Sequence, residues 1–297
     1  MGFKIDAEFL LKADSYGREK MREHLLAKHP GINGSIVGRS ILSRPIEAYF
    51  IGRGRRYVFL VAAHHALESI TVNFSFAFMD YLMSKSQFGA INGVDCKLLL
   101  SKYCFVVVPC VNPEGIELRM NGAGNTPLTE RLMRMSGGDF SFWQANARGV
   151  DLNHNYNYGF SEYKRIEAAE SIGAGRSLYS GEEPESEPET RGVANLVRTL
   201  MPFSLVSLHT QGEEIYAYPD TARVKRCAER LAKITGYRTA SPTGTAAYGG
   251  LSDYASSLGI PSFTLELGKG ENPLDESMLG GIFPKVADAI AFLPTLL

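Results

Sequence analysis

The chain has 297 residues, of which 44% are hydrophobic and 21% are charged, and its 31 Lys and Arg nearly balance its 32 Asp and Glu. This apolar content excludes an intrinsically disordered protein, and the net charge of −1 excludes the basic surface on which nucleic-acid binding depends. No repeat or composition break divides the chain, so we predict a single domain over residues 1–297.

Short apolar runs alternate with helical patterns along the chain. This alternation is typical of an α/β domain with a mixed, largely parallel central sheet flanked by helices. The predicted strands are 46–51, 57–63, 104–111, 203–208, 214–218 and 262–267, and the predicted helices are 16–29, 67–84, 188–201, 222–235, 251–258 and 285–293. Several strands are apolar at nearly every position, so we expect them at the centre of the sheet, covered on both faces.

The start of the helix predicted at 188–201 is the best marked. Ser186 is the expected cap, Pro188 suits the first turn, and Glu189 lies three residues after the cap. The segments 121–147 and 157–185, by contrast, are rich in Gly, Ser and Asn and favour no regular element. Structureless segments of this length are uncommon and usually functional, so we expect them to wall a binding site.

The chain shows no sign of export or of membrane insertion. Its apolar runs, such as 57–63, are far shorter than the ~20 residues of a membrane span, and charges interrupt the N-terminal sequence before a signal-peptide core can form. The four cysteines form no Cys-x-x-Cys pair, so we expect reduced, buried thiols. These features predict a cytoplasmic protein with neither a membrane nor a nucleic-acid partner.

Three potential metal ligands lie at predicted strand ends. His65 and Glu68 follow the strand 57–63, and His209 follows the strand 203–208. Taken alone, His65 and Glu68 are weak evidence, since a polar strand end followed by a helix with an acidic first turn explains them, and His209 alone is more typical of a hydrogen-bonded structural residue. Open α/β sheets, however, bind ligands at the carboxyl ends of their strands, and two His with one Glu form a known zinc ligand set that leaves one position open for water. Together they predict a catalytic zinc site.

Glu266 is a carboxylate inside the apolar strand 262–267. Burying an unpaired carboxylate is costly, so a cation or a hydrogen-bond network must compensate it, or it acts as a general base with a shifted pKa.

Five short sequence blocks between about residues 60 and 268 follow one another in the same order as the motifs of a known enzyme family. They are His65-Ala-Leu-Glu68, Val111-Asn-Pro-Glu-Gly115, Gly149-Val-Asp-Leu-Asn153, Ser207-Leu-His209-Thr-Gln and Thr264-Leu-Glu266-Leu. On these blocks the chain resembles the zinc carboxypeptidase family. The resemblance implies a carboxypeptidase-like fold and one zinc ion per chain, bound by His65, Glu68 and His209. It also implies that Glu266 is the base that activates the attacking water, that Asp151 orients His65, and that Asn153 helps to hold a substrate carboxylate.

Three positions depart from the usual pattern of that family. His154 stands where the family has an Arg that binds a C-terminal carboxylate bidentately. Gln144 stands where many relatives have an Arg that stabilises the oxyanion, so either Gln144 or the nearby Arg148 is the expected donor, with Arg148 slightly favoured. Thr245 replaces the mobile Tyr of digestive carboxypeptidases, and Tyr248, three residues later, is the remaining candidate for substrate binding.

The run Asn146-Ala-Arg-Gly-Val-Asp-Leu-Asn-His-Asn-Tyr156 is most similar to the bacterial branch of the family that cleaves the γ-D-glutamyl bond to a diamino acid. This resemblance implies a small peptide substrate, a cell-wall muropeptide that contains diaminopimelate. Two alternatives stay open: a general C-terminal carboxypeptidase or deglutamylase, and a non-catalytic peptide-binding homologue. Retention of the three ligands together with Glu266 argues against the second. The sequence does not predict the oligomeric state.

Overall fold

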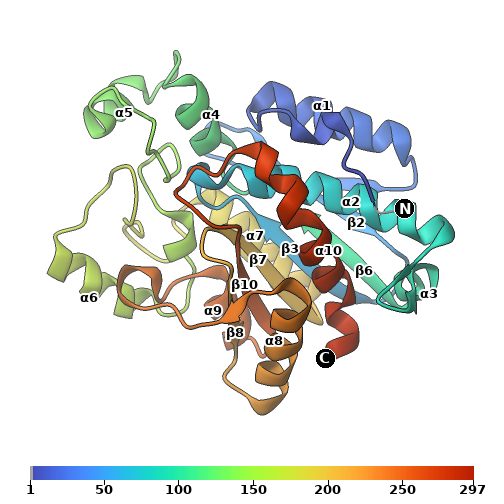
Figure 1. Cartoon of the computed structure of the whole chain (residues 1–297). Coiled ribbons are helices and arrows are strands. Elements are labelled where there is room, and N and C mark those ends of the chain that lie inside the picture. Colours follow the sequence, from blue (N-terminus) through green and yellow to red (C-terminus); the bar gives the residue numbers. More distant parts are fainter. Residues whose placement is uncertain (1–2) are drawn as a thin grey trace.

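An eight-stranded mixed sheet forms the centre of the computed structural model, which describes residues 3–297 (Figure 1). In spatial order the strands are β1 (Asn33–Arg39), β2 (Pro45–Ile51), β6 (Tyr103–Val108), β3 (Arg56–Ala62), β7 (Ser204–Thr210), β10 (Ser262–Leu267), β8 (Glu214–Tyr218) and β9 (Arg238–Thr239). Neighbours are parallel from β6 through β3 and β7 to β10, whereas β2 and β8 pair antiparallel with this central group. The predicted mixed, largely parallel sheet is confirmed.

Helices cover both faces of this sheet (Figure 1). One face packs against α1 (Ser15–Lys28), α2 (Ile70–Phe88), α3 (Cys96–Lys102), α8 (Ala222–Thr235) and α10 (Leu279–Leu296). The other packs against α7 (Pro188–Leu200) and α9 (Leu251–Ser257). The shorter elements are α4 (Pro113–Asn121), α5 (Thr129–Ser136), α6 (Phe160–Glu170), the two-stranded ribbon of β4 (Ala90–Ile91) and β5 (Val94–Asp95), and five 3₁₀ turns.

Strand β3 shows why the centre of the sheet is recognisable in the sequence. Val58 and Leu60 belong to the apolar cluster on one face, while Phe59 and Val61 belong to the cluster on the other, and all four are fully buried. Since successive side chains of a strand point to opposite faces, a strand covered on both sides has to be apolar throughout. Burial of each such side chain contributes about 1.5–3 kcal/mol.

Several elements differ from the sequence-based prediction. Helices α5 and α6 lie inside the two segments that favoured no regular element, and β1 is an edge strand that exposes most of its residues. Helix α10 begins at Leu279, ahead of the predicted start at residue 285, and it contains Pro284. Pro188 occupies the first turn of α7 as predicted, but Ser186 as its cap is wrong. The capping position is Glu187, and the Ser186 hydroxyl bonds the side chains of Asn155 and Glu187 instead.

The C-terminal helix is apolar along much of its length. The stretch Glu276–Leu296 is long and apolar enough to cross a membrane, with a mean hydropathy of 1.3. Half of it is buried inside the protein, where α10 packs against α8 and α2, as expected for a core helix. Its composition is therefore weak evidence for a membrane span. The four cysteines are free and buried, as predicted.

Candidate metal centre and substrate pocket

The three predicted metal ligands meet because β3 and β7 are adjacent parallel strands. Ala62 pairs with Leu208 at the carboxyl ends of the two strands, and His209 directly follows Leu208. After β3, Ala63 adopts a left-handed conformation with φ of 56°, and the chain turns into the short 3₁₀ helix Ala66–Glu68. This turn brings the side chains of His65 and Glu68 to His209 at the carboxyl end of β7.

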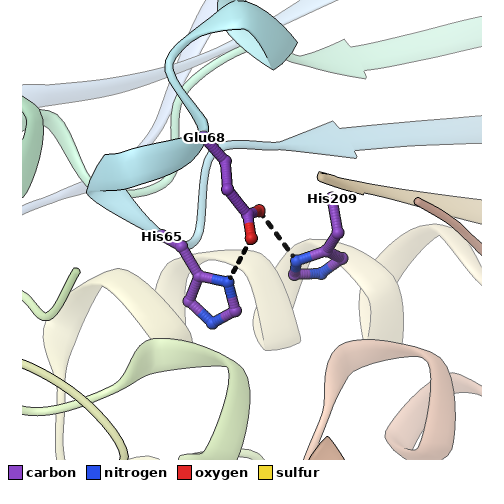
Figure 2. A group of neighbouring side chains, drawn as sticks. All are labelled: His65, Glu68 and His209. Atoms are coloured by element: carbon purple, nitrogen blue, oxygen red, sulfur yellow. Dashed lines mark hydrogen bonds and ion pairs between the residues drawn. The ribbon is translucent and has the colours of Figure 1, made fainter. Parts of the chain in front are cut away.

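The side chains of His65, Glu68 and His209 point toward one another in a buried cluster (Figure 2). The Nδ1 atom of His65 lies 2.9 Å from Oε1 of Glu68, and Nδ1 of His209 lies 3.0 Å from Oε2 of the same carboxylate. One potential ligand atom from each residue lies within 4.8 Å of the others. The neighbouring His64 is outside this group, since its Nε2 lies 2.8 Å from the hydroxyl of Tyr156.

The outer nitrogens of both imidazoles have partners of their own. Nε2 of His65 lies 3.0 Å from Oδ1 of Asp151, and Nε2 of His209 lies 3.1 Å from the hydroxyl of Ser207. A hydrogen on each Nε2 leaves a lone pair on each Nδ1, aimed at the centre of the cluster.

Two nitrogen lone pairs and two carboxylate oxygens then face one another, and such an arrangement needs a cation or extra protons between the atoms. In the absence of a cation, the neighbouring carboxylates favour protonation of His65. Burial alone would lower the pKa of His65, but Glu68 and Asp151 raise it well above its ordinary value. The donor set of two imidazoles and one carboxylate fits zinc, which takes these ligands.

Asp151 is fully buried and accepts hydrogen bonds on both carboxylate oxygens. The oxygens lie 3.0 Å from Nε2 of His65, 3.2 Å from Nε2 of Gln144, and 3.1 and 3.2 Å from the backbone nitrogens of Asn153 and Leu178. Burial would raise the pKa of Asp151, but the adjacent His65 and His154 and these donors hold it well below its ordinary value. An ionised carboxylate fixed in this way can orient the imidazole of His65.

Glu266 lies on β10 beside His209 on the neighbouring parallel strand. Burial raises the pKa of Glu266 to about 7, an effect that His209 opposes and Glu68 reinforces. A carboxyl group with a pKa near the working pH can both accept and return a proton.

A cavity of about 180 Å³ opens beside the cluster. Eight of the predicted site residues line it, and these are His65, Glu68, Gln144, Asn153, His154, His209, Tyr248 and Glu266. Arg148 is not among them. Its guanidinium lies 3.6 Å from the carboxylate of Glu187, and its side chain is 46% exposed. None of the lining residues within the described range 3–297 is Lys or Arg.

Local contacts hold the pocket residues His154 and Asn153 in place. Nδ1 of His154 lies 2.8 Å from the carbonyl oxygen of Tyr248, and its ring stacks on Tyr163 with centroids 3.8 Å apart. Burial lowers the pKa of His154, which favours the neutral imidazole. Tyr248 has a φ of 67° and a half-exposed ring. Oδ1 of Asn153 accepts a hydrogen bond from the backbone N–H of Leu251 at 3.2 Å.

Sequence reasoning assigned no role to several residues of this region. Ser207 holds His209, and it was identifiable in principle, because residues two apart on a strand share one face. Asp253, Tyr216 and Tyr218 also line the cavity. Asp253 follows Tyr248-Gly-Gly250, a segment that also resembles the zinc carboxypeptidase family, but an acidic residue in the first turn of a helix is ordinary and no role was predicted for it.

Known proteins resemble this chain in sequence and in fold. A sequence profile described as zinc carboxypeptidase matches residues 19–288. The chain is 30% identical over 267 residues to gamma-D-glutamyl-L-diamino acid endopeptidase 1 of Lysinibacillus sphaericus. The aligned region covers 87% of this chain and 66% of that protein. It is 32% identical over 108 residues to murein peptide amidase A of Escherichia coli K12, covering 35% of this chain and 34% of the amidase. The chain therefore spans at most about two thirds of the length of these two relatives.

Among solved structures, thrombin activatable fibrinolysis inhibitor superposes with a TM-score of 0.73 at 21% identity, covering 93% of this chain and 74% of that one. At this identity the likeness supports the fold alone.

Proposed function

Because this chain belongs to the zinc carboxypeptidase family of hydrolases, we propose that it hydrolyses a peptide amide bond with one zinc ion per chain, bound by His65, Glu68 and His209. The observation that carries the proposal is the buried cluster, in which ligand atoms of the three residues lie within 4.8 Å of one another beside a cavity. Glu266 lies at the same cavity, so a proton acceptor accompanies the metal ligands.

Zinc at this site would supply the Lewis acid that polarises a substrate carbonyl and makes water acidic. The chain's own residues do the rest. Glu266 accepts a proton from the attacking water and passes it to the departing amine nitrogen, for which a pKa near 7 is suitable. Asp151 keeps His65 in the tautomer that presents Nδ1.

The oxyanion donor in this proposal is Gln144 rather than Arg148. An amide group has two N–H donors, and one of those of Gln144 binds Asp151, which leaves the other for a substrate oxygen. Gln144 lines the cavity, whereas Arg148 faces Glu187 outside it. A preorganised donor at the developing negative charge stabilises the transition state.

The substrate we propose is a small muropeptide with a γ-D-glutamyl bond to a diamino acid such as diaminopimelate. Two relatives are named for this bond and for murein peptides. No Lys or Arg among the described lining residues of the cavity forms the bidentate clamp of a general carboxypeptidase, which lowers discrimination for a plain C-terminal carboxylate and leaves recognition to the rest of the substrate residue. His154, with its lowered pKa, does not supply a positive charge there either.

The test is product identification with the zinc-loaded protein and three peptides: L-Ala-γ-D-Glu-diaminopimelate, a plain L-tripeptide and a γ-linked polyglutamate. We expect hydrolysis of the first peptide at the γ-D-glutamyl bond. Preferred hydrolysis of either of the others would establish one of the alternative activities.

Glu266→Gln is the matched control for this activity. It should keep the zinc and lose about 10²–10⁴-fold in turnover, the usual worth of a general base. A wild-type protein that binds the peptides without cleaving any of them would establish the peptide-binding alternative.

A further inference from the structure

Asn112 joins the turn that carries the metal ligands to the segment that carries Gln144. It is fully buried and caps α4, where its Oδ1 accepts from the backbone N–H of Gly115 at 2.9 Å. Its Nδ2 faces three backbone carbonyl oxygens, those of His64 at 3.0 Å, Ala145 at 3.1 Å and Gln144 at 3.2 Å. An amide nitrogen has only two hydrogens, so at least one of them is shared between two carbonyl groups.

Backbone hydrogen bonds complete this connection between segments that are distant in the chain. The N–H of Asn112 donates to the carbonyl oxygen of Ala63, and the N–H of Ala66 donates to that of Gln144, both at 3.0 Å. The metal ligand His65 lies between Ala63 and Ala66 in the turn after β3. This turn is therefore bonded at its start to Asn112 and at its end to Gln144.

Gly115 shows how closely the side chain of Asn112 is enclosed. A Cβ atom at position 115 would lie 2.4 Å from Nδ2 and 2.5 Å from Oδ1 of Asn112, and 2.5 Å from the carbonyl oxygen of Ala145. Cβ atoms do not approach other atoms so closely, so glycine leaves the room that this amide occupies. Hydrogen bonds and lack of space together fix the amide of Asn112.

Asn112 itself does not line the substrate cavity, whereas His65 and Gln144 do. The placement of a catalytic group matters as much as its chemistry, since a displacement of about 1 Å can cost roughly 10²-fold in rate. A residue that fixes an oxyanion donor relative to a metal ligand can therefore affect the reaction without contacting the substrate.

We infer that Asn112 is a positioning residue, which holds Gln144 at a fixed place relative to the metal-ligand turn and so aligns its free N–H with the substrate oxyanion. The inference deepens the proposed function and rests on it for the role of Gln144 as the oxyanion donor. Its structural part, the placement of residues 143–145 by Asn112, can be tested without any reaction.

The test variant is Asn112→Ser. Serine caps helices about as well as asparagine, so the start of α4 is retained, but its short side chain has no amide to reach the three carbonyl groups. The matched control is Asn73→Ser in α2, because Asn73 is also fully buried and its Nδ2 also donates to backbone carbonyl groups, those of Phe9 at 2.9 Å and Leu11 at 2.8 Å. None of these three residues lines the cavity, so the control should lose stability and keep catalysis.

Trp143 reports directly on the placement of this segment. It is the only tryptophan of the sequence, it is fully buried, and it directly precedes Gln144. In the zinc-loaded protein, Asn112→Ser should increase the quenching of Trp143 fluorescence by acrylamide, because the carbonyl groups that follow it lose a bond that holds them in place. Asn73→Ser should keep the wild-type quenching. Unchanged quenching in a folded Asn112→Ser protein would overturn the inference, whatever the substrate is.

Kinetics test the consequence for the reaction. With L-Ala-γ-D-Glu-diaminopimelate, Asn112→Ser should lower kcat about 10–100-fold and keep KM within about threefold, since the donor acts on charge that develops in the transition state. In a Gln144→Ala background, the same substitution should change kcat by less than about threefold, because the side chain that it positions is gone. An equal loss in both backgrounds would show that Asn112 does not act through Gln144, and would overturn the inference.

Two outcomes separate this inference from the function that it deepens. If no peptide is cleaved while the quenching of Trp143 rises in Asn112→Ser and not in Asn73→Ser, the placement by Asn112 is supported and the proposed reaction is wrong. If the peptide is cleaved and Asn112→Ser keeps the wild-type kcat, the inference is wrong and the proposed reaction stands. Should Asn112→Ser fail to fold, Gly115→Ala displaces the same amide with Asn112 retained, and the same changes in quenching and kcat are expected of it.

Discussion

Glu189 is expected to make the protein less stable as the pH rises from 5 to 8, and Glu189→Gln should remove that loss. The residue is fully buried in α7. Its Oε1 accepts from the backbone N–H of Ile41 at 3.0 Å, and its Oε2 lies 3.5 Å from Nδ2 of Asn146. Burial, reinforced by the nearby Glu114 and Glu187, raises the pKa of Glu189 from 4.5 to about 8.

The sign of the effect follows from where the proton is held. Below pH 4.5 both the folded and the unfolded states carry the proton, so the group causes no loss. Between 4.5 and about 8 the unfolded state ionises while the folded state keeps its proton, and stability falls by up to about 1.4 kcal/mol per pH unit. Over the three pH units from 5 to 8 the loss is up to about 4 kcal/mol, and relaxation of the site makes about 1–3 kcal/mol the expected range.

The assay is urea unfolding of wild type and Glu189→Gln at the same zinc concentration between about pH 5 and pH 8. The difference between their free energies of unfolding removes the contribution of the other titrating groups, which the two proteins share. Gln keeps the acceptor for Ile41 and mimics the protonated acid. The control is Glu187→Gln in the same cluster, which removes a carboxylate that accepts from Asn146 at 2.7 Å and lies 3.6 Å from Arg148. It should destabilise the protein. If the difference between wild type and Glu189→Gln is constant across this pH range, the reasoning is wrong.

Three further predictions concern the metal centre and the cavity. Asp151→Asn should raise the zinc dissociation constant about 10–100-fold, measured by chelator competition, since it weakens the anchor of His65, and unchanged affinity would contradict the positioning role. Gln144→Ala should lower kcat about 10²-fold or more, whereas Arg148→Ala should stay within about threefold of wild type; the reverse order would show that Arg148 is the donor. His154→Arg should increase kcat/KM for peptides with a free C-terminal carboxylate relative to their C-terminal amides, chiefly through KM, because it adds a cation to the cavity. An unchanged ratio, with the fold intact, would mean that position 154 does not contact the substrate carboxylate.

The sequence by itself determined the elements whose pattern is local. Helix α8, β8 and β10 all have the predicted bounds. The meeting of His65, Glu68 and His209 could also be predicted, because side chains that follow neighbouring parallel strands arrive at the same edge of the sheet.

Only the tertiary structure decided how the loops around that edge arrange their side chains. The segment that carries Gln144 and Asp151 is positioned by backbone hydrogen bonds to Arg176 and Tyr179, far along the chain, and the same folding turns Arg148 toward Glu187. Asp253 likewise reaches the cavity through the packing of α9 against the sheet. Such contacts join residues that are distant in sequence and leave no periodic pattern, whereas strands and helices record their burial in the spacing of their apolar residues.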